Sequence, residues 1–247
     1  MILFLAAAVA AATTPSLKEE RFNACVDLAS KSPVQAIETA NSWLVEGGGV
    51  LARHCLGLAY ASDARWLSAA TAFEQAARQA EREGDGRTAS LWVQAGNAAL
   101  AGNEPARARG YLDSALIGGL LRGAEKGEAH LDRARALVAL KQNAAARADF
   151  DAALKLVPAD PLAWLLSATI ARRMEDLPRA TKDISEATRL SPDDAQVALE
   201  AGNIALLNGS PGAARIAWDA AVKNAPTSPA GKAAAEALKQ FEAPTMR

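Results

Sequence analysis

The amino-acid sequence predicts an all-α protein, an α-solenoid of stacked helix–turn–helix repeats. Half of its 247 residues are hydrophobic, yet aromatic residues make up only 5%. Ala is abundant and β-branched residues are sparse, which favours closely packed helices over sheets. An internal repeat is the second indication: AGNAALAGN at 95–103 returns as AGNIALLNG at 201–209, 106 residues later. This separation is three times 34 plus four, and 34 residues is a known solenoid period.

A pattern of small, large and small residues supports this period. Counted from a first small residue, the pattern returns 12, 16 and 19 positions further along the chain. The five copies are Gly57 with Ala69, Phe73 and Ala76; Gly96 with Ala108, Leu112 and Ala115; Ala134 with Ala146, Phe150 and Ala153; Ala168 with Ala180, Ile184 and Ala187; and Gly202 with Ala214, Trp218 and Ala221. Small residues are expected where two helices cross, because a larger side chain would push the helices apart. We therefore expect Gly96 and Gly202 to pack helices rather than to bind phosphate.

The pattern resembles the tetratricopeptide repeat (TPR), a 34-residue helix–turn–helix unit. The TPR signature has a small residue at position eight, Ala at twenty, a large residue at twenty-four, Ala at twenty-seven and Pro at thirty-two. Trp92 and Trp164 fall at position four, where the family favours Trp, and Tyr60 falls at position eleven. The resemblance implies a right-handed α-solenoid of TPR-like repeats with a C-terminal capping helix.

Helix-start signals agree with the repeat boundaries. Asp160, Ser210 and Ser228 each precede a Pro, so each is expected to cap a helix whose first residue is that Pro. The elements expected in order are a signal peptide at 1–12, a degenerate first repeat at 17–47, repeats at 50–84, 89–122, 127–160, 161–194 and 195–228, and a capping helix at 229–241, with 50–241 forming a single TPR-like domain.

The first residues, MILFLAAAVAAATTPS, predict an export signal. The apolar run from Ile2 to Ala12 is shorter than the ~20 residues that span a bilayer. Its end, Ala10-Ala11-Ala12, fits the small-residue rule for cleavage. The segment lacks a Lys or Arg, so an uncleaved anchor and a cytosolic N-terminal helix stay open as alternatives. We expect an exported, periplasmic protein without a stable membrane span. A lipid anchor is disfavoured because the segment has no Cys.

Composition and motifs argue against an enzyme and against nucleic-acid binding. The net charge of −1 offers no basic face to displace counterions from phosphates. No P-loop, HExxH or CxxC motif is present, and no Ser or Cys can be assigned to either histidine as a nucleophile. His130 falls at position four of its unit and is expected to pack within a helix. The acidic residues have helical surface spacing, which predicts a solvated face. We expect no catalytic residues, no cofactor and no metal.

Cys25 and Cys55, with His54 beside the second, have three possible states. The resemblance places both cysteines on the first helices of neighbouring repeats, which run parallel and touch. In an exported protein an even pair of cysteines favours a disulfide. Closing a loop of about 30 residues would stabilise the fold by roughly 3 kcal/mol. Two free core thiols and a Cys/His metal site also stay open, although the metal site lacks an apparent fourth ligand.

The resemblance also implies a concave groove, lined by positions two, five, nine, twelve and thirteen of the first helices. The candidates are Val93, Leu131, Leu165 and Leu199 at position five, Asn97, Arg135, Thr169 and Asn203 at position nine, and Arg172 and Arg173 at positions twelve and thirteen. They predict an apolar stripe beside amide and guanidinium donors, suited to an extended or helical segment with acidic groups. The alternative is that these residues pack against a neighbouring helix or face water. The carboxylate-clamp subgroup of the family uses Lys at position five, so Val93 and Leu199 argue against that activity.

The sequence therefore favours a non-enzymatic scaffold or adaptor that binds a peptide or a partner helix in the bacterial cell envelope. One alternative is an accessory or assembly factor for an envelope enzyme or for a secretion or pilus complex. A hydrolase built on a helical array has the least support. The fold by itself does not identify the partner, the pathway or the oligomeric state.

Overall fold

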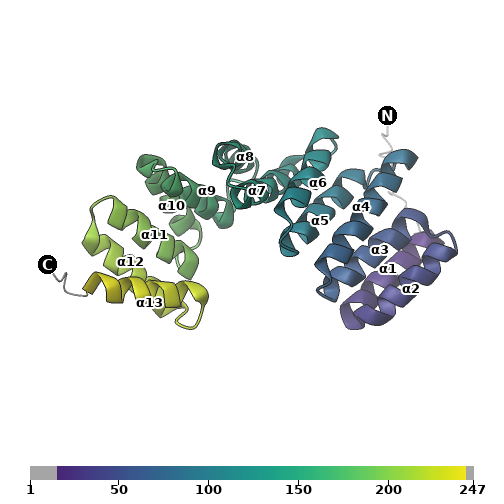
Figure 1. The fold of residues 1–247 in the computed structure, drawn as a ribbon, viewed down its shortest axis with the longest axis horizontal. Helices are drawn as coiled ribbons and strands as arrows, with labels where there is room; N and C mark the ends of the chain where they lie inside the picture. The colour runs from purple at the N-terminus through teal and green to yellow at the C-terminus, as the bar shows by residue number, and fades with distance from the viewer. Residues whose placement is uncertain (1–15, 243–247) are drawn as a thin grey trace, which may run out of the picture. The chain divides into compact units, whose positions relative to one another are not determined.

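A computed structural model describes residues 16–242, which form thirteen α-helices and no β-strand (Figure 1). Consecutive helices pack as pairs, and the helices in substantial contact are separated along the chain by at most one other helix. This confirms the predicted all-α solenoid. The signal peptide predicted at 1–12 lies outside the described residues.

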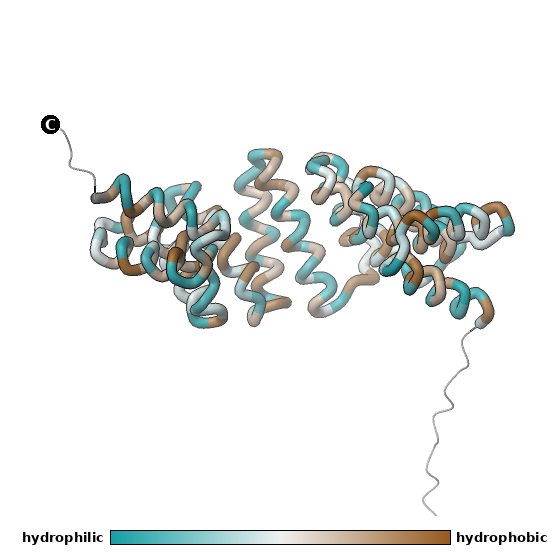
Figure 2. Tube along the Cα trace, turned by 90° about the horizontal axis from the view of Figure 1, so that it is seen from below, coloured by the Kyte–Doolittle hydropathy of each residue, from teal (hydrophilic) through white to brown (hydrophobic). Residues whose placement is uncertain are grey.

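Each repeat has a first helix and a second helix, called helix A and helix B. The A–B pairs are α1 (Leu17–Lys31) and α2 (Pro33–Val45), α3 (Gly49–Ser62) and α4 (Trp66–Glu83), α5 (Thr88–Ala101) and α6 (Pro105–Ile117), α7 (Gly123–Ala139) and α8 (Asn143–Leu156), α9 (Pro161–Arg173) and α10 (Leu177–Leu190), and α11 (Ala195–Leu207) and α12 (Pro211–Asn224), followed by α13 (Pro229–Glu242). Apolar and polar residues are interspersed along these helices (Figure 2). Among residues 16–242, no helix is both long and apolar enough to cross a membrane.

The chain divides into two compact units, one ending at Leu91 and one beginning at Trp92, so the boundary lies within α5. In the first unit, α1 to α4 share an Ala-rich core. In the second unit, separate apolar clusters fill the spaces between successive helix pairs. The single domain expected over 50–241 stays a prediction.

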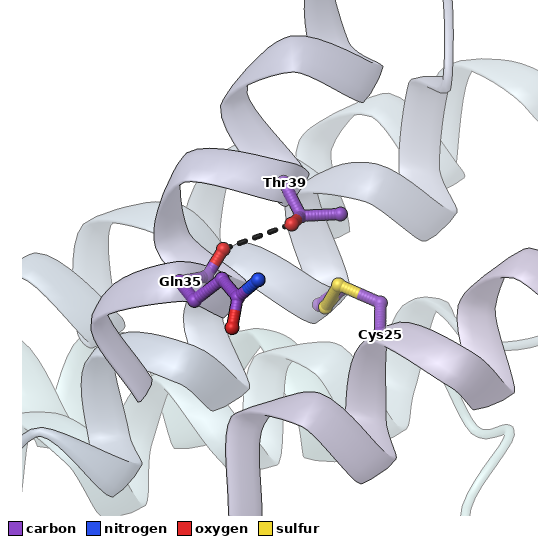
Figure 3. The surroundings of a disulfide bond; sticks show 4 residues. Cys25, Gln35 and Thr39 are labelled. Atoms are coloured by element: carbon purple, nitrogen blue, oxygen red, sulfur yellow. Dashed lines mark hydrogen bonds between the residues drawn. A yellow bond between two sulfur atoms is a disulfide. The ribbon is translucent and has the colours of Figure 1, made fainter. Parts of the chain in front are cut away.

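A disulfide between Cys25 on α1 and Cys55 on α3 joins the A helices of the first two repeats (Figure 3). The two Cα atoms are 6.1 Å apart, and both side chains are buried in the core of the first unit. Nearby on α2, the Thr39 hydroxyl donates to the carbonyl oxygen of Gln35 at 2.9 Å, so it is satisfied within its own helix. Of the three possible states of the cysteines, the structure has the disulfide, which leaves no thiolate for a metal. Within residues 16–242, no three His, Cys, Asp or Glu side chains are grouped to hold a metal ion.

Gly96 and Gly202 lie where helix A crosses helix B. A Cβ atom at Gly96 would lie 2.6 Å from Cγ of Leu112, and one at Gly202 would lie 2.4 Å from Cδ1 of Trp218. Both distances are shorter than any normal carbon–carbon contact, so a side chain fits at neither position. This confirms that the repeated AGNxAL stretch reflects helix packing.

The turn from helix A to helix B places a left-handed residue at position fifteen in five successive pairs. These residues are Ala64 (φ 54°), Asn103 (φ 58°), Lys141 (φ 60°), Glu175 (φ 61°) and Gly209 (φ 69°). This conformation costs roughly 1–2 kcal/mol for a residue with a Cβ atom, so the turn at Gly209 alone among them avoids the cost. The first pair lacks this turn: α1 and α2 are joined by Ser32, whose φ is −147°. The first repeat, whose sequence is degenerate, thus also differs in the connection between its two helices.

Side-chain caps at the helix starts agree with two of the three predicted positions. Asp160 accepts the backbone N–H of Leu162 at 2.9 Å, and the Ser228 hydroxyl accepts that of Gly231 at 3.0 Å. Ser210 makes no side-chain cap hydrogen bond. There Pro211 alone supplies the helix-start signal, because its ring fixes φ near the helical value.

The sequence predicts that the acidic residues lie on a solvated face, but Asp149 on α8 is an exception. It is 4% exposed, and Arg133 on α7 contacts it at 2.6 Å while also contacting Asp113 on α6 at 2.9 Å. The Nδ1 atom of His130 lies 2.8 Å from the same carboxylate, so His130 is a hydrogen-bonding residue rather than a packing residue alone. Burial by itself would raise the pKa of Asp149, but the hydrogen bonds from Arg133 and His130 outweigh burial and lower it.

Asp183 on α10 occupies the same repeat position one unit later. It is fully buried, accepts hydrogen bonds from Ser167 and Arg179 at 2.6 Å each, and shares Arg179 with Asp151 of the preceding repeat. At each of two successive repeat interfaces, an Arg side chain thus bridges two carboxylates, Arg133 at the first interface and Arg179 at the second. The Arg comes from helix A in one case and from helix B in the other, so sequence spacing alone does not reveal the recurrence.

Candidate functional site

A pocket of about 150 Å³ opens between α7 and α9, the A helices of two successive repeats in the second unit. The residues that line it are Arg135, Val138, Phe150, Leu166, Thr169, Ile170 and Arg173. Those from α9 are spaced three and four positions apart, so they form one stripe along that helix. The pocket brings together three of the predicted groove positions, those of Arg135, Thr169 and Arg173.

The pocket combines an apolar wall with two guanidinium groups. Phe150 and Ile170, each 1% exposed, belong to the core beneath it, whereas Arg135 and Arg173 are exposed. An apolar cavity of roughly 150 Å³ is large enough to bind benzene, so this pocket can accept one apolar side chain. A carboxylate next to that side chain could form charge-assisted hydrogen bonds with the guanidinium groups.

Arg135 already has a carboxylate partner on its own helix. Its Nη1 donates to Asp132 at 2.9 Å, with the Asp132 side chain 14% exposed and the Arg135 side chain 49% exposed. Asn97 on α5 also hydrogen-bonds the Asp132 carboxylate. Burial raises the pKa of Asp132, because the hydrogen bonds from Arg135 and Asn97 offset only part of the desolvation. Two predicted groove residues therefore converge on one carboxylate of the protein itself.

Arg172 is not part of the pocket, which corrects its expected role as a groove donor. Its Nε donates to Oε1 of Glu200 on α11 at 2.6 Å, and Glu200 is only 7% exposed. Asn203 donates to the other Glu200 oxygen at 3.3 Å and accepts from Nε1 of Trp218 at 3.2 Å. Arg172 and Asn203 are therefore occupied by internal partners.

The position-five residues do not form the exposed apolar stripe that the sequence predicts. Leu131 and Leu165 are 5% and 6% exposed and belong to the apolar clusters between helix pairs. Leu199 is half-buried against the cluster around Trp218, and Val93 is half-buried as well. Position five faces the neighbouring helices here, so these side chains stabilise the stack and offer little area to a ligand.

Position six, which the sequence-based prediction did not include, determines where the pocket opens. It is Asp132 in one repeat, Leu166 in the next and Glu200 in the third. The two carboxylates pair with nearby arginines of the A helices. Leu166 instead lines the pocket, and Arg173 beside it has no ion-pair partner among the described residues. The alternation of acidic, apolar and acidic residues at one repeat position is the signal that could have located the site.

An all-helical array of stacked helix pairs with a small pocket between A helices defines a helical-repeat scaffold of the kind that binds other proteins. Two tetratricopeptide repeat family models match the chain, over residues 127–170 and 165–229. Residues 127–229 are therefore tetratricopeptide repeats. A comparison with curated protein sequences gives no match.

Several solved structures have the same fold. PilW, a widely conserved type IV pilus biogenesis factor, is 18% identical with a TM-score of 0.72, covering 89% of this chain and 98% of PilW. The pilF protein of Pseudomonas aeruginosa is 15% identical with a TM-score of 0.71, covering 91% and 100% of the two chains. YrrB, a TPR protein with an unusual peptide-binding site, is 18% identical with a TM-score of 0.62, covering 81% and 96%. At these identities the likeness establishes the fold.

Proposed function

We propose that this protein is a non-enzymatic interaction scaffold, and that the pocket between α7 and α9 anchors an apolar side chain of an acidic peptide segment or partner helix. The observation that carries the proposal is the placement of Arg135 and Arg173 around a pocket with an apolar wall. An apolar anchor provides contact area, and the guanidinium groups select a ligand that carries carboxylates.

The two arginines have different roles in this proposal. Arg173 is exposed and has no ion-pair partner among the described residues, so it can receive a ligand carboxylate directly. Arg135 is shared with Asp132. Thr169 lies between them on the pocket wall, but its hydroxyl donates to the carbonyl oxygen of Leu165 at 2.9 Å. Recognition of the carboxylate therefore falls first to Arg173.

The experiment is a binding titration with a fluorescein-labelled peptide in which a central Leu is flanked on both sides by Asp. Arg173→Glu should weaken binding at least tenfold, because the ligand would meet like charge. Leu166→Glu should do the same, since it places a carboxylate at the pocket wall. Arg215→Glu on α12 is the matched control, because it makes the same charge change at an exposed position outside the pocket. Binding that is unchanged in Arg173→Glu, or equally weakened in Arg215→Glu, would refute the proposed site.

We also propose that the protein acts in the cell envelope. The apolar segment at 1–12 favours export, and the buried disulfide between Cys25 and Cys55 fits an oxidising compartment. N-terminal sequencing of the protein from its native host should then give a mature chain that begins near Thr13. An intact Met1 in a soluble cytosolic fraction would contradict this location.

A second candidate function is assembly of a pilus or secretion complex. The likeness to pilF and PilW favours it, because it extends over 100% and 98% of those two chains. If it holds, deletion of the gene in the native host should reduce surface piliation, and the wild-type gene should restore it. Normal piliation in the deletion strain would leave the general scaffold as the proposed function.

A further inference from the structure

We infer that Asp132 is an internal competitor for the ligand: it neutralises Arg135, so a second ligand carboxylate gains little from Arg135 until Asp132 itself is neutralised. This inference rests on the proposed function, because it concerns the same pocket and the same acidic ligand. It assigns Asp132 as the residue that determines whether the site distinguishes ligands with one carboxylate from ligands with two.

The geometry places Asp132 behind the pocket rather than in it. Asp132 lies one helical turn before Arg135 on α7, pairs with it at 2.9 Å, and is not among the residues that line the pocket. Its side chain is largely covered, while nearly half of the Arg135 side chain stays exposed on the pocket side. The Arg135 guanidinium is planar and carries five N–H donors, so the donors that do not face Asp132 remain available to a ligand.

The pairing makes the two arginines of the pocket unequal. A ligand carboxylate that approaches Arg173 meets an uncompensated positive charge. A carboxylate that approaches Arg135 meets a charge that Asp132 already neutralises, and it also experiences repulsion from Asp132. A ligand with one carboxylate therefore binds Arg173 without competition from a carboxylate of the protein. In a ligand with two carboxylates, the second one gains little binding energy from Arg135 until Asp132 is neutralised.

Acidification should release Arg135. Burial raises the pKa of Asp132, so Asp132 takes up a proton before ligand carboxylates of ordinary pKa, about 3.9. The α5 helix packs its neutral Asn97 against Asp132 and carries no titratable side chain. The charged groups on the other elements around α7 are Arg107, Arg109 and Asp113 on α6, Arg147, Asp149, Asp151 and Lys155 on α8, and Arg172 and Arg173 on α9. Among all of these and the charged residues of α7 itself, Arg135 is the one whose charge acts on the pKa of Asp132.

The test compares two fluorescein-labelled peptides, one with a central Leu flanked by two Asp and one in which Asn replaces the second Asp. In the full-length protein at pH 7, Asp132→Asn should tighten binding of the two-carboxylate peptide about threefold or more, the range of an exposed ion pair. Binding of the one-carboxylate peptide should stay within about twofold. Equal effects on both peptides, or no effect on the two-carboxylate peptide, would overturn the inference.

A second measurement covers the case in which Asp132→Asn impairs folding. In the wild type, affinity for the two-carboxylate peptide should rise as the pH is lowered from 7 toward the ordinary carboxylate range, before the ligand carboxylates themselves take up protons, and Arg135→Gln should abolish the rise. An affinity that is flat or falls over this range in the wild type would also overturn the inference. Failure of the proposed function looks different, because then neither peptide would bind and Arg173→Glu would change nothing.

Discussion

Arg172 on α9 and Glu200 on α11 form an ion pair that ties the A helices of two successive repeats, with Nε 2.6 Å from Oε1. Glu200 keeps 9% of its side chain exposed and Arg172 keeps 24%. Removing one partner of such a pair leaves the other charge buried without compensation. Arg172→Glu should therefore lower the free energy of unfolding by about 2–4 kcal/mol, less than for a fully buried pair because Arg172 is partly exposed.

Urea unfolding of the second unit's helices would measure this change. Arg173→Glu is the control one position along, where the exposed side chain should change stability by less than about 0.5 kcal/mol. The double variant Arg172→Glu with Glu200→Arg should recover part of the loss. Equal unfolding midpoints for Arg172→Glu and Arg173→Glu would contradict the structural role of the pair.

The glycines at the helix crossings should tolerate no side chain. Gly202→Leu and Gly96→Leu should each destabilise by about 1–3 kcal/mol, because the added atoms would overlap Trp218 and Leu112. Gly110→Ala on α6 is the control: the position is exposed, an added Cβ atom would have nothing within 4 Å, and the change should stabilise by about 0.5–1 kcal/mol. Thermal melting separates the outcomes, and a loss of stability in Gly110→Ala would show that helix packing is not the cause.

The left-handed turn residues offer a way to stabilise the array. Glu175→Gly should raise the free energy of unfolding by about 0.5–1 kcal/mol, because Gly adopts φ 61° without the steric cost. Gly209→Ala should do the reverse by about 1 kcal/mol, and since nothing lies within 4 Å of its added Cβ, the effect would come from the backbone alone. Chemical denaturation of both variants checks the pair. If the two substitutions changed the free energy of unfolding in the same direction, the left-handed conformation would not be the cause.

The disulfide should contribute strongly to the first unit. Its sequence separation of 30 corresponds to a contribution of about 3–4 kcal/mol from loop closure. Cys25→Ser should lower the stability of α1 to α4 by that amount, with no change in hydrogen exchange of α9 to α12. Reduction of the wild type should have the same effect, and a reductant should not alter the double variant Cys25→Ser with Cys55→Ser. A reduced wild type as stable as the oxidised protein would contradict the prediction.

The fold was predictable because the packing rule is local and repeats. Gly96 contacts a residue sixteen positions later in its own helix pair, and the same spacing recurs in five of the six pairs, so sequence alone shows it. The pocket was only partly predictable, because its character depends on contacts between repeats. From the sequence alone, Arg172 is interpreted as a groove donor. In the structure it pairs with Glu200, which lies 28 residues further along the chain. Leu165 is likewise interpreted from the sequence as an exposed groove residue, but in the structure it is buried because the next A helix packs close to it.

The bond between Cys25 and Cys55 also has a consequence for how the protein is made. The chain contains two cysteines, and both are in this bond. A sequence with four cysteines allows three connectivities, whereas two cysteines allow a single one within the molecule. Maturation therefore requires an oxidant but no isomerase to correct internal mispairing. The thiol of α1 has no partner until α3 has been synthesised, so until then the newly made chain carries one unpaired cysteine, and thiol-trapping reagents should capture it in this interval.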